Sequence, residues 1–243
     1  MRLIYFPLRA RAEPLRMLLR HAEVAFTDEI VPLAVWPELK PRVPGNQLPQ
    51  LQLEDGTLLP QTRDIALRAA MLASPLKKLL PIDAVMAGTA LHCWQEIHRT
   101  SLPFITDCWA EATPWDARIG ACNPLLNWLP EREATPLIPA YLAGAAGWFT
   151  ELEERFHGGG VFFGGPSPHH GDFASFHVTD HICTLDGGAL LAAQAQRVRD
   201  WHAAMHALPA VAAYLRERPQ PGTGEVGRPG SLIFEHARPW ERV

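Results

Sequence analysis

A tyrosine and two arginines stand close together near the N-terminus, between a short apolar run and a helical pattern. The apolar run ends with Tyr5, Arg9 and Arg11 follow, and Pro14 opens the helical pattern. In open α/β sheets, ligands gather at the carboxyl ends of strands, where this turn would lie. A phenol there can donate a hydrogen bond to an anion. The alternative is a core tyrosine at a strand end beside a solvated turn.

Two further polar sets have donors suited to a carboxylate. Gln61 and Thr62 stand just before and at the start of a helical pattern, and a helix N-terminus presents free N–H groups and partial positive charge. Trp36, Lys40 and Gln47, here called the loop donors, add an indole N–H, an ammonium and an amide. The alternatives are that Thr62 is simply an N-cap and that the loop donors form an exposed loop.

Histidines occur in two pairs with helical spacing. His177 and His181 form one pair, and His202 and His206 form the other. Such pairs can chelate a metal ion from one helix face. The sequence shows no third ligand for either pair, and helical histidines are common, so we expect no metal.

The first 74 residues alternate between strand and helix patterns. We expect strands at residues 3–6, 26–31, 50–54 and 57–59, and helices at residues 14–22 and 62–71. Asp55-Gly56 predicts a hairpin turn between the last two strands. The order β-α-β followed by β-β-α is that of a thioredoxin-like α/β domain.

Helical patterns alone follow the first domain, so residues 81–220 are predicted to form an all-α domain. Its helices are expected at residues 82–106, 138–157, 171–185, 194–207 and 210–216, with a long proline-rich connection at 113–136. Residues 221–243 read as an extended tail. The apolar residues 232–234 are expected to pack back on the protein, either over the first domain or over the ligand cleft, where they would form a partial lid.

Composition excludes several classes of partner. The net charge is −4 and the basic residues are scattered, so neither nucleic acid nor an anionic membrane is expected. No apolar run is long enough to span a membrane, and early charges interrupt any signal-peptide pattern, so we expect a cytoplasmic protein. The four cysteines lack paired metal spacing and are expected to be free thiols.

Five motifs, in chain order over about residues 1–220, resemble the tyrosine-type cytosolic glutathione S-transferases, closest to the sigma and pi classes. They are Tyr5 with Arg9-Ala10-Arg11-Ala12-Glu13-Pro14, Trp36-Pro37-Glu38-Leu39-Lys40, Asn46-Gln47-Leu48-Pro49-Gln50-Leu51, Gln61-Thr62 with Ile65-Ala66, and the last core helix at 206–215. The resemblance implies a homodimer with a thioredoxin-like domain followed by a helical domain, and glutathione as co-substrate.

The resemblance assigns the chemistry to Tyr5 and Arg11. The nucleophile is the glutathione thiolate, and a hydrogen bond to a charged group contributes about 1.5–3 kcal/mol. At about 1.4 kcal/mol per pKa unit, a Tyr5 donor would lower the thiol pKa by about one to two units. Arg11 would add positive potential near the sulfur or orient the tyrosine.

The same resemblance assigns the binding of the rest of glutathione. Pro49 is expected to follow a cis peptide bond, which would turn the Leu48 backbone toward the cysteinyl backbone of glutathione. Gln61 and Thr62 would hold the γ-glutamyl carboxylate, and the loop donors would hold the glycyl end. The alternative for Pro49 is an ordinary trans proline at a strand start.

The second substrate is expected to be a hydrophobic electrophile. Its pocket is predicted from Phe6, Leu8, Arg9, Leu102, Ile105, Thr106 and Trp109, although ordinary core packing explains the last four residues equally well. The chain departs from the family pattern at Ala90, where relatives place an aspartate that reaches the neighbouring subunit's glutathione. It also departs at His169, where relatives place a helix-capping hydroxyl.

Three functions remain open from the sequence. The leading one is transfer of glutathione to an electrophilic carbon. The second is a glutathione-dependent isomerase that resembles prostaglandin synthases of the sigma class. The third is a non-catalytic carrier or structural protein with this fold, against which the retained Tyr5, Gln61 and Thr62 argue.

Overall fold

The structure is a computed structural model of the chain. It describes residues 1–7, 9–32, 35–72, 139, 142, 149, 152–153, 156, 159–163, 165–168 and 170–218. The predicted helix at 82–106, the connection at 113–136 and the tail at 221–243 lie outside the described residues. The domain boundaries therefore stay predictions.

A four-stranded mixed sheet forms the first part of the chain, with strand order β2-β1-β3-β4. Strand β1 (Arg2–Tyr5) runs parallel to β2 (Thr27–Ile30) and antiparallel to β3 (Gln50–Gln52), which pairs antiparallel with β4 (Leu58–Pro60). Gly56 has a φ of 85° in the β3–β4 hairpin turn, a conformation that favours glycine. The predicted strands and the hairpin are confirmed; β2 and β3 are shorter than predicted, and β1 and β4 are shifted by one residue.

Helices flank these strands in the predicted order. A 3₁₀ turn, η1 (Ala10–Ala12), leads into α1 (Glu13–His21), and α3 (Thr62–Leu72) follows β4. Between β2 and β3 the chain forms the short helix α2 (Trp36–Leu39) and the 3₁₀ turns η3 (Lys40–Arg42) and η4 (Pro44–Asn46). These three short elements were not predicted, because a single turn carries no periodicity. The thioredoxin-like order β-α-β, β-β-α is confirmed.

The last part of the described chain is helical. It comprises α9 (His170–Asp186), α10 (Ala189–Ala192), α11 (Gln196–Ala207) and α12 (Pro209–Glu217). The predicted helices at 171–185, 194–207 and 210–216 are confirmed with small changes at their ends. The short helix α10 was not predicted. At its N-terminus, the Asp186 carboxylate accepts hydrogen bonds from the backbone N–H groups of Gly188 and Leu190.

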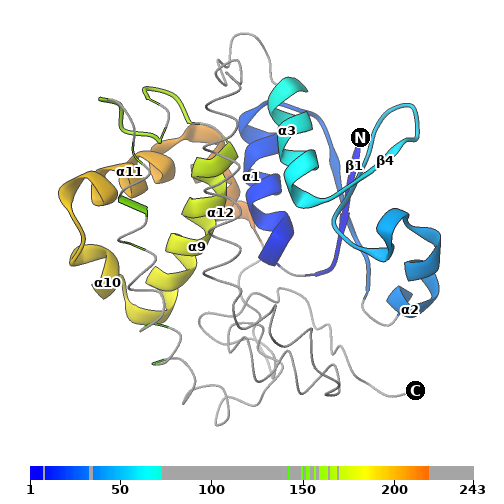
Figure 1. The fold of residues 1–243 in the computed structure, drawn as a ribbon, viewed down its shortest axis with the longest axis horizontal. Coiled ribbons are helices and arrows are strands. Elements are labelled where there is room, and N and C mark those ends of the chain that lie inside the picture. Colours follow the sequence, from blue (N-terminus) through cyan, green and yellow to red (C-terminus); the bar gives the residue numbers. More distant parts are fainter. Residues whose placement is uncertain are drawn as a thin grey trace.

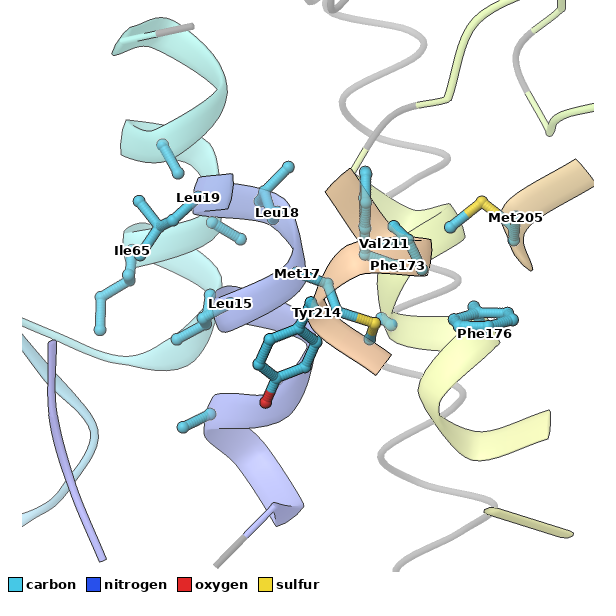
Figure 2. Close-up of a cluster of buried hydrophobic side chains, with 14 of the residues drawn as sticks. Leu15, Met17, Leu18, Leu19, Ile65, Phe173, Phe176, Met205, Val211 and Tyr214 are labelled. Atoms are coloured by element: carbon cyan, nitrogen blue, oxygen red, sulfur yellow. The ribbon is translucent and has the colours of Figure 1, made fainter. Parts of the chain in front are cut away.

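Helix α1 lies at the centre of the molecule, with α3 on one side and α9 and α12 on the other (Figure 1). Figure 2 shows Leu15 and Leu19 on the side of α1 toward Ile65 of α3, while Met17 lies toward Tyr214 of α12. All these side chains are buried. Because α1 is apolar on more than one face, it joins the sheet domain to the helical region.

A buried carboxylate fastens α1 to the end of the described chain. Glu13 is fully buried and accepts hydrogen bonds from the Tyr214 hydroxyl at 2.8 Å and from Arg218 Nη1 at 2.9 Å. Arg16 Nη1 lies 3.5 Å from the same carboxylate, and Arg16 Nε donates to Asp28 at 2.7 Å. The positive charges of Arg16 and Arg218 therefore balance the buried negative charge of Glu13.

A second buried carboxylate organises the helical region. Asp172 on α9 accepts hydrogen bonds from the Trp201 indole N–H at 2.8 Å and from the Phe163 backbone N–H at 3.1 Å. Trp201 and Phe163 stack with ring centroids 5.3 Å apart. This carboxylate thus joins α9, α11 and the segment before α9.

Candidate active site

Three predicted site residues meet at one edge of the sheet. The last paired row across three strands is formed by Ile4, Gln50 and Pro60. The residues one step beyond this row are Tyr5, Pro49 and Gln61. The hydrogen-bonded register therefore places the phenol, the proline and the start of α3 side by side at the carboxyl end of β1.

Tyr5 is held as a neutral phenol. The residue is 5% exposed, and burial raises the pKa of its phenol, while the charge and the backbone N–H of Arg11 oppose that shift. The Arg16 guanidinium lies 5.9 Å from the centre of the Tyr5 ring. Because the phenol stays protonated, its hydrogen is the group that this side chain can offer to an anion.

The two arginines after Tyr5 occupy different surroundings. Arg11 is half-buried, and its charge acts on the Tyr5 hydroxyl. Arg9 is buried, and burial together with the charge of Arg218 lowers its pKa, while Glu13 opposes that shift. Arg9 therefore contributes to the charged junction of α1 and α12, and its place in an acceptor pocket stays a prediction.

Aromatic rings connect Tyr5 to the first of the loop donors. The Tyr5 and Phe6 ring centroids lie 5.4 Å apart, and those of Phe6 and Trp36 lie 5.2 Å apart in an edge-to-face arrangement. Trp36 is half-buried at the start of α2, whereas Lys40 and Gln47 are exposed. The donors expected at the glycyl end thus lie on the segment that leads from β2 to β3.

A buried glutamine fixes the loop in front of Pro49. Gln50 is fully buried, and its side-chain N–H groups donate to the carbonyls of Pro44 and Gln47, both at 2.8 Å. The Leu48–Pro49 peptide bond is cis, as the sequence predicted, and both side chains are buried. This positioning role of Gln50 was not predicted, because a glutamine in a strand has many ordinary roles.

The start of α3 has an unusual backbone at Gln61. This residue has a φ of 71°, in the left-handed region, and its carbonyl accepts the first helical hydrogen bond from the Ile65 N–H at 3.0 Å. Gln61 is therefore the N-cap, and Thr62, which is 7% exposed, is the first helical residue. The alternative in which Thr62 is simply the N-cap is wrong, since the Gln61 carbonyl already accepts the first helical hydrogen bond.

The chain is similar in sequence to glutathione S-transferases and to a prostaglandin D synthase. No family model matches the chain. A class-mu 28 kDa glutathione S-transferase of Schistosoma japonicum is 48% identical over 54 residues, which cover 22% of this chain and 26% of that protein. The hematopoietic prostaglandin D synthase of Gallus gallus is 27% identical over 219 residues, which cover 90% of this chain and 96% of that protein. The solved structure of rat hPGDS complexed with a quinoline is 23% identical with a TM-score of 0.64, and the match covers 90% of this chain and 97% of that chain.

The fold is that of the glutathione S-transferases. The predicted fold class is thus confirmed, with a thioredoxin-like sheet domain followed by a helical region. The matched segment spans about a quarter of the Schistosoma relative's own length.

In this glutathione S-transferase fold, the described residues hold only part of the predicted acceptor pocket. Phe6 is half-buried between Tyr5 and Trp36. Arg9 lies at the charged junction described above, and the other five predicted pocket residues lie outside the described residues; they are Leu8, Leu102, Ile105, Thr106 and Trp109. Both departures from the family pattern, Ala90 and His169, also lie outside the described residues.

Two other predictions from the sequence, on the cysteines and on membrane-spanning segments, concern residues that the structure describes. Cys183 is a free thiol, and burial raises its pKa to about 12, so it is a poor nucleophile at neutral pH. The other three cysteines lie outside the described residues. Among the described helices, none combines the length and the apolar character needed to cross a bilayer.

Proposed function

We propose that this protein is a glutathione transferase in which Tyr5 stabilises the thiolate of glutathione for attack on an electrophilic carbon. The observation that carries the proposal is the state of the Tyr5 hydroxyl. Burial raises the pKa of the phenol, so it stays protonated at neutral pH, and the strand register places Tyr5 at the sheet edge beside Pro49. A neutral phenol donates a hydrogen bond to the thiolate and does not remove the proton as a base.

The bond changes in this reaction are simple. The thiol proton leaves to solvent, the sulfur lone pair forms a carbon–sulfur bond, and the leaving group departs or a double bond accepts the electrons. Tyr5 and the positive charge of Arg11 favour the anionic sulfur before attack. A thiol with an ordinary pKa of about 8.5 is then substantially ionised at pH 7.

The remainder of glutathione is proposed to follow the same edge of the sheet. Its γ-glutamyl carboxylate would lie at the start of α3 beside Gln61 and Thr62, where free N–H groups favour an anion. The Leu48 backbone would pair with its cysteinyl residue, and the loop donors would bind its glycyl carboxylate. Loss of any of these contacts is expected to weaken binding more than chemistry.

A glutathione-dependent isomerase is the second candidate. The observation that favours it is the match to a hematopoietic prostaglandin D synthase, which extends over 90% of this chain. Isomerisation would use the same thiolate, which attacks the substrate and is later released. We further propose that the protein works in the cytoplasm as a homodimer, without a metal in this reaction and without nucleic acid or membrane partners.

The decisive experiment is the titration of bound glutathione in Tyr5→Phe. Without the phenolic donor, the pKa of the bound thiol should rise by about one to two units, with little loss of glutathione affinity. Thiolate absorbance against pH measures the shift, and turnover with a chlorodinitrobenzene substrate at pH 6.5 should fall about tenfold or more. A prostaglandin endoperoxide assayed in parallel distinguishes the isomerase.

The matched control is Tyr214→Phe. Tyr214 is also buried, but its hydroxyl donates to Glu13 at the junction of α1 and α12. Its removal should lower stability and leave the thiolate titration unchanged. An unchanged titration in Tyr5→Phe would remove Tyr5 from the mechanism.

A further inference from the structure

We propose that Asp180, His202 and His206 form a binding site for Zn²⁺, or a similar first-row divalent cation, between α9 and α11. The two histidines come from successive turns of α11, and the carboxylate comes from the facing turn of α9. One potential ligand atom from each residue lies within 4.8 Å of the other two. The sequence showed no third ligand for the histidine pair, and the fold supplies it.

The spacing of the ligand atoms suits a tetrahedral metal. Asp180 Oδ1 lies 3.4 Å from His206 Nε2. Ligands at about 2.0–2.1 Å from a tetrahedral Zn²⁺ are themselves about 3.4 Å apart. A Zn²⁺ ion could therefore bridge these two atoms with little movement, and a rotation of the His202 ring would complete three protein ligands.

His202 is held with an unused nitrogen. Its Nε2 is buried and has no hydrogen-bond partner in the part of the chain that the structure describes. Phe176 contacts both imidazoles, with ring centroids 5.2 Å from His202 and 4.8 Å from His206, and the two imidazoles lie 4.6 Å apart. A buried ring nitrogen without a partner is costly, and metal coordination would satisfy it.

The carboxylate is oriented by a neighbouring guanidinium. Asp180 Oδ2 accepts a hydrogen bond from Arg218 Nη2 at 3.0 Å, which leaves Oδ1 to face the histidines. Arg218 also donates to Glu13, so its charge is shared between two carboxylates. Such outer contacts commonly orient metal ligands.

The ligand types in the cluster indicate which cation it would bind, and its exposure indicates what would fill the fourth coordination position. Two imidazoles and one carboxylate suit Zn²⁺, Cu²⁺ or Ni²⁺, whereas Mg²⁺ and Ca²⁺ prefer oxygen ligands throughout. The His206 side chain is 42% exposed and that of Asp180 is 16% exposed, so the cluster is open to solvent on one side. Water can then fill the fourth position, as in open zinc sites. The proposal does not rest on glutathione, because Tyr5 belongs to a different part of the fold.

The test is titration of the full chain, free of any histidine tag, with Zn²⁺ in a calorimeter. We expect saturable binding of one ion per chain and a higher melting temperature with Zn²⁺ present. Bound Co²⁺ should show the intense visible absorption of tetrahedral coordination. The variant His206→Gln removes an exposed ligand without burying a new group, and it should weaken binding by at least about 100-fold.

Two more variants make the result specific. His202→Ala should weaken Zn²⁺ binding to a similar extent. Asp200→Asn is the matched control, since this exposed carboxylate lies on the same helix and accepts a hydrogen bond from Gln196 outside the cluster. It should leave the affinity unchanged. Equal Zn²⁺ affinity in wild type and His206→Gln, or no saturable binding to the wild type, would overturn the site.

Discussion

The substitution Glu13→Gln tests whether the buried charge cluster holds the first helix to the rest of the molecule. Glu13 accepts from the Tyr214 hydroxyl and from Arg218, and Arg16 lies beside it. Burial alone would raise the pKa of this carboxyl, but the guanidiniums of Arg16 and Arg218 outweigh burial and hold the pKa below its ordinary 4.5. Glutamine keeps the shape of the side chain and removes its charge.

The magnitude follows from the contacts that glutamine cannot keep. Its one carbonyl oxygen can accept from Tyr214 or from Arg218, but its amide group turns a donor toward the other. Breaking a buried ion pair by removing one partner costs about 3–5 kcal/mol. Arg16 and Arg218 retain Asp28 and Asp180 as partners, so we expect the lower end, about 3 kcal/mol.

The assay is urea unfolding at fixed protein concentration, with the midpoint and slope compared between wild type and variant. The folded pKa of Glu13 lies below the unfolded one, so its contribution is complete above about pH 4.5 and is lost as the pH falls through the folded pKa. The difference between the two proteins should therefore stay constant from pH 7 to about pH 5 and shrink in more acidic buffer.

Glu29→Gln is the matched control. Glu29 forms an ion pair with Arg2 on the surface, where the two side chains are 39% and 49% exposed. Such a pair contributes about 0–1 kcal/mol. If Glu13→Gln costs no more than Glu29→Gln, or if its cost does not change between pH 5 and pH 3.5, the buried carboxylate does not hold the junction in the way described.

Three further outcomes are expected. Thr62→Ala should raise the KM for glutathione with little change in kcat, because its contact would exist before and during the reaction; an unchanged KM with a large fall in kcat would contradict the assignment. Gln50→Ala should lower stability by about 1–3 kcal/mol and weaken glutathione binding, since it frees the loop before the cis proline; calorimetric titration with glutathione would detect the loss, and wild-type affinity would argue against a positioning role. Asp172→Ala should cost about 3 kcal/mol or more and alter the fluorescence of Trp201, whose indole N–H loses this acceptor; unfolding followed by circular dichroism would reveal a smaller effect.

The sequence predicted the parts of the fold that depend on local order. Helix α1 was predicted from Pro14 and the leucine spacing after it, and the hairpin was predicted from Asp55-Gly56. Each of these signals lies within a few residues of the chain. The short helix at Trp36 was missed, since one turn has no period. The backbone of Gln61 was also missed, because a positive φ in a residue other than glycine leaves no mark in the sequence.

Contacts between distant segments could not be predicted in the same way. The resemblance to glutathione S-transferases indicated which residues to expect at the sheet edge, and the strand register places Tyr5, Pro49 and Gln61 there. Nothing in the sequence paired Glu13 with Arg218, or Asp180 with His206. Each of these pairs depends on how helices pack, and side-chain spacing along one helix carries no information about the helix that faces it.

The link between Glu13 and Arg218 has a consequence for how the chain folds during synthesis. These residues are 205 positions apart, so a ribosome that adds about 5–20 residues per second makes the second about 10–40 s after the first. Until α9 and α12 have been made, the apolar sides of α1 that they cover in the folded protein lack these partners. The sheet domain is made first but cannot cover its central helix alone, so packing around α1 is complete only after translation has passed α12.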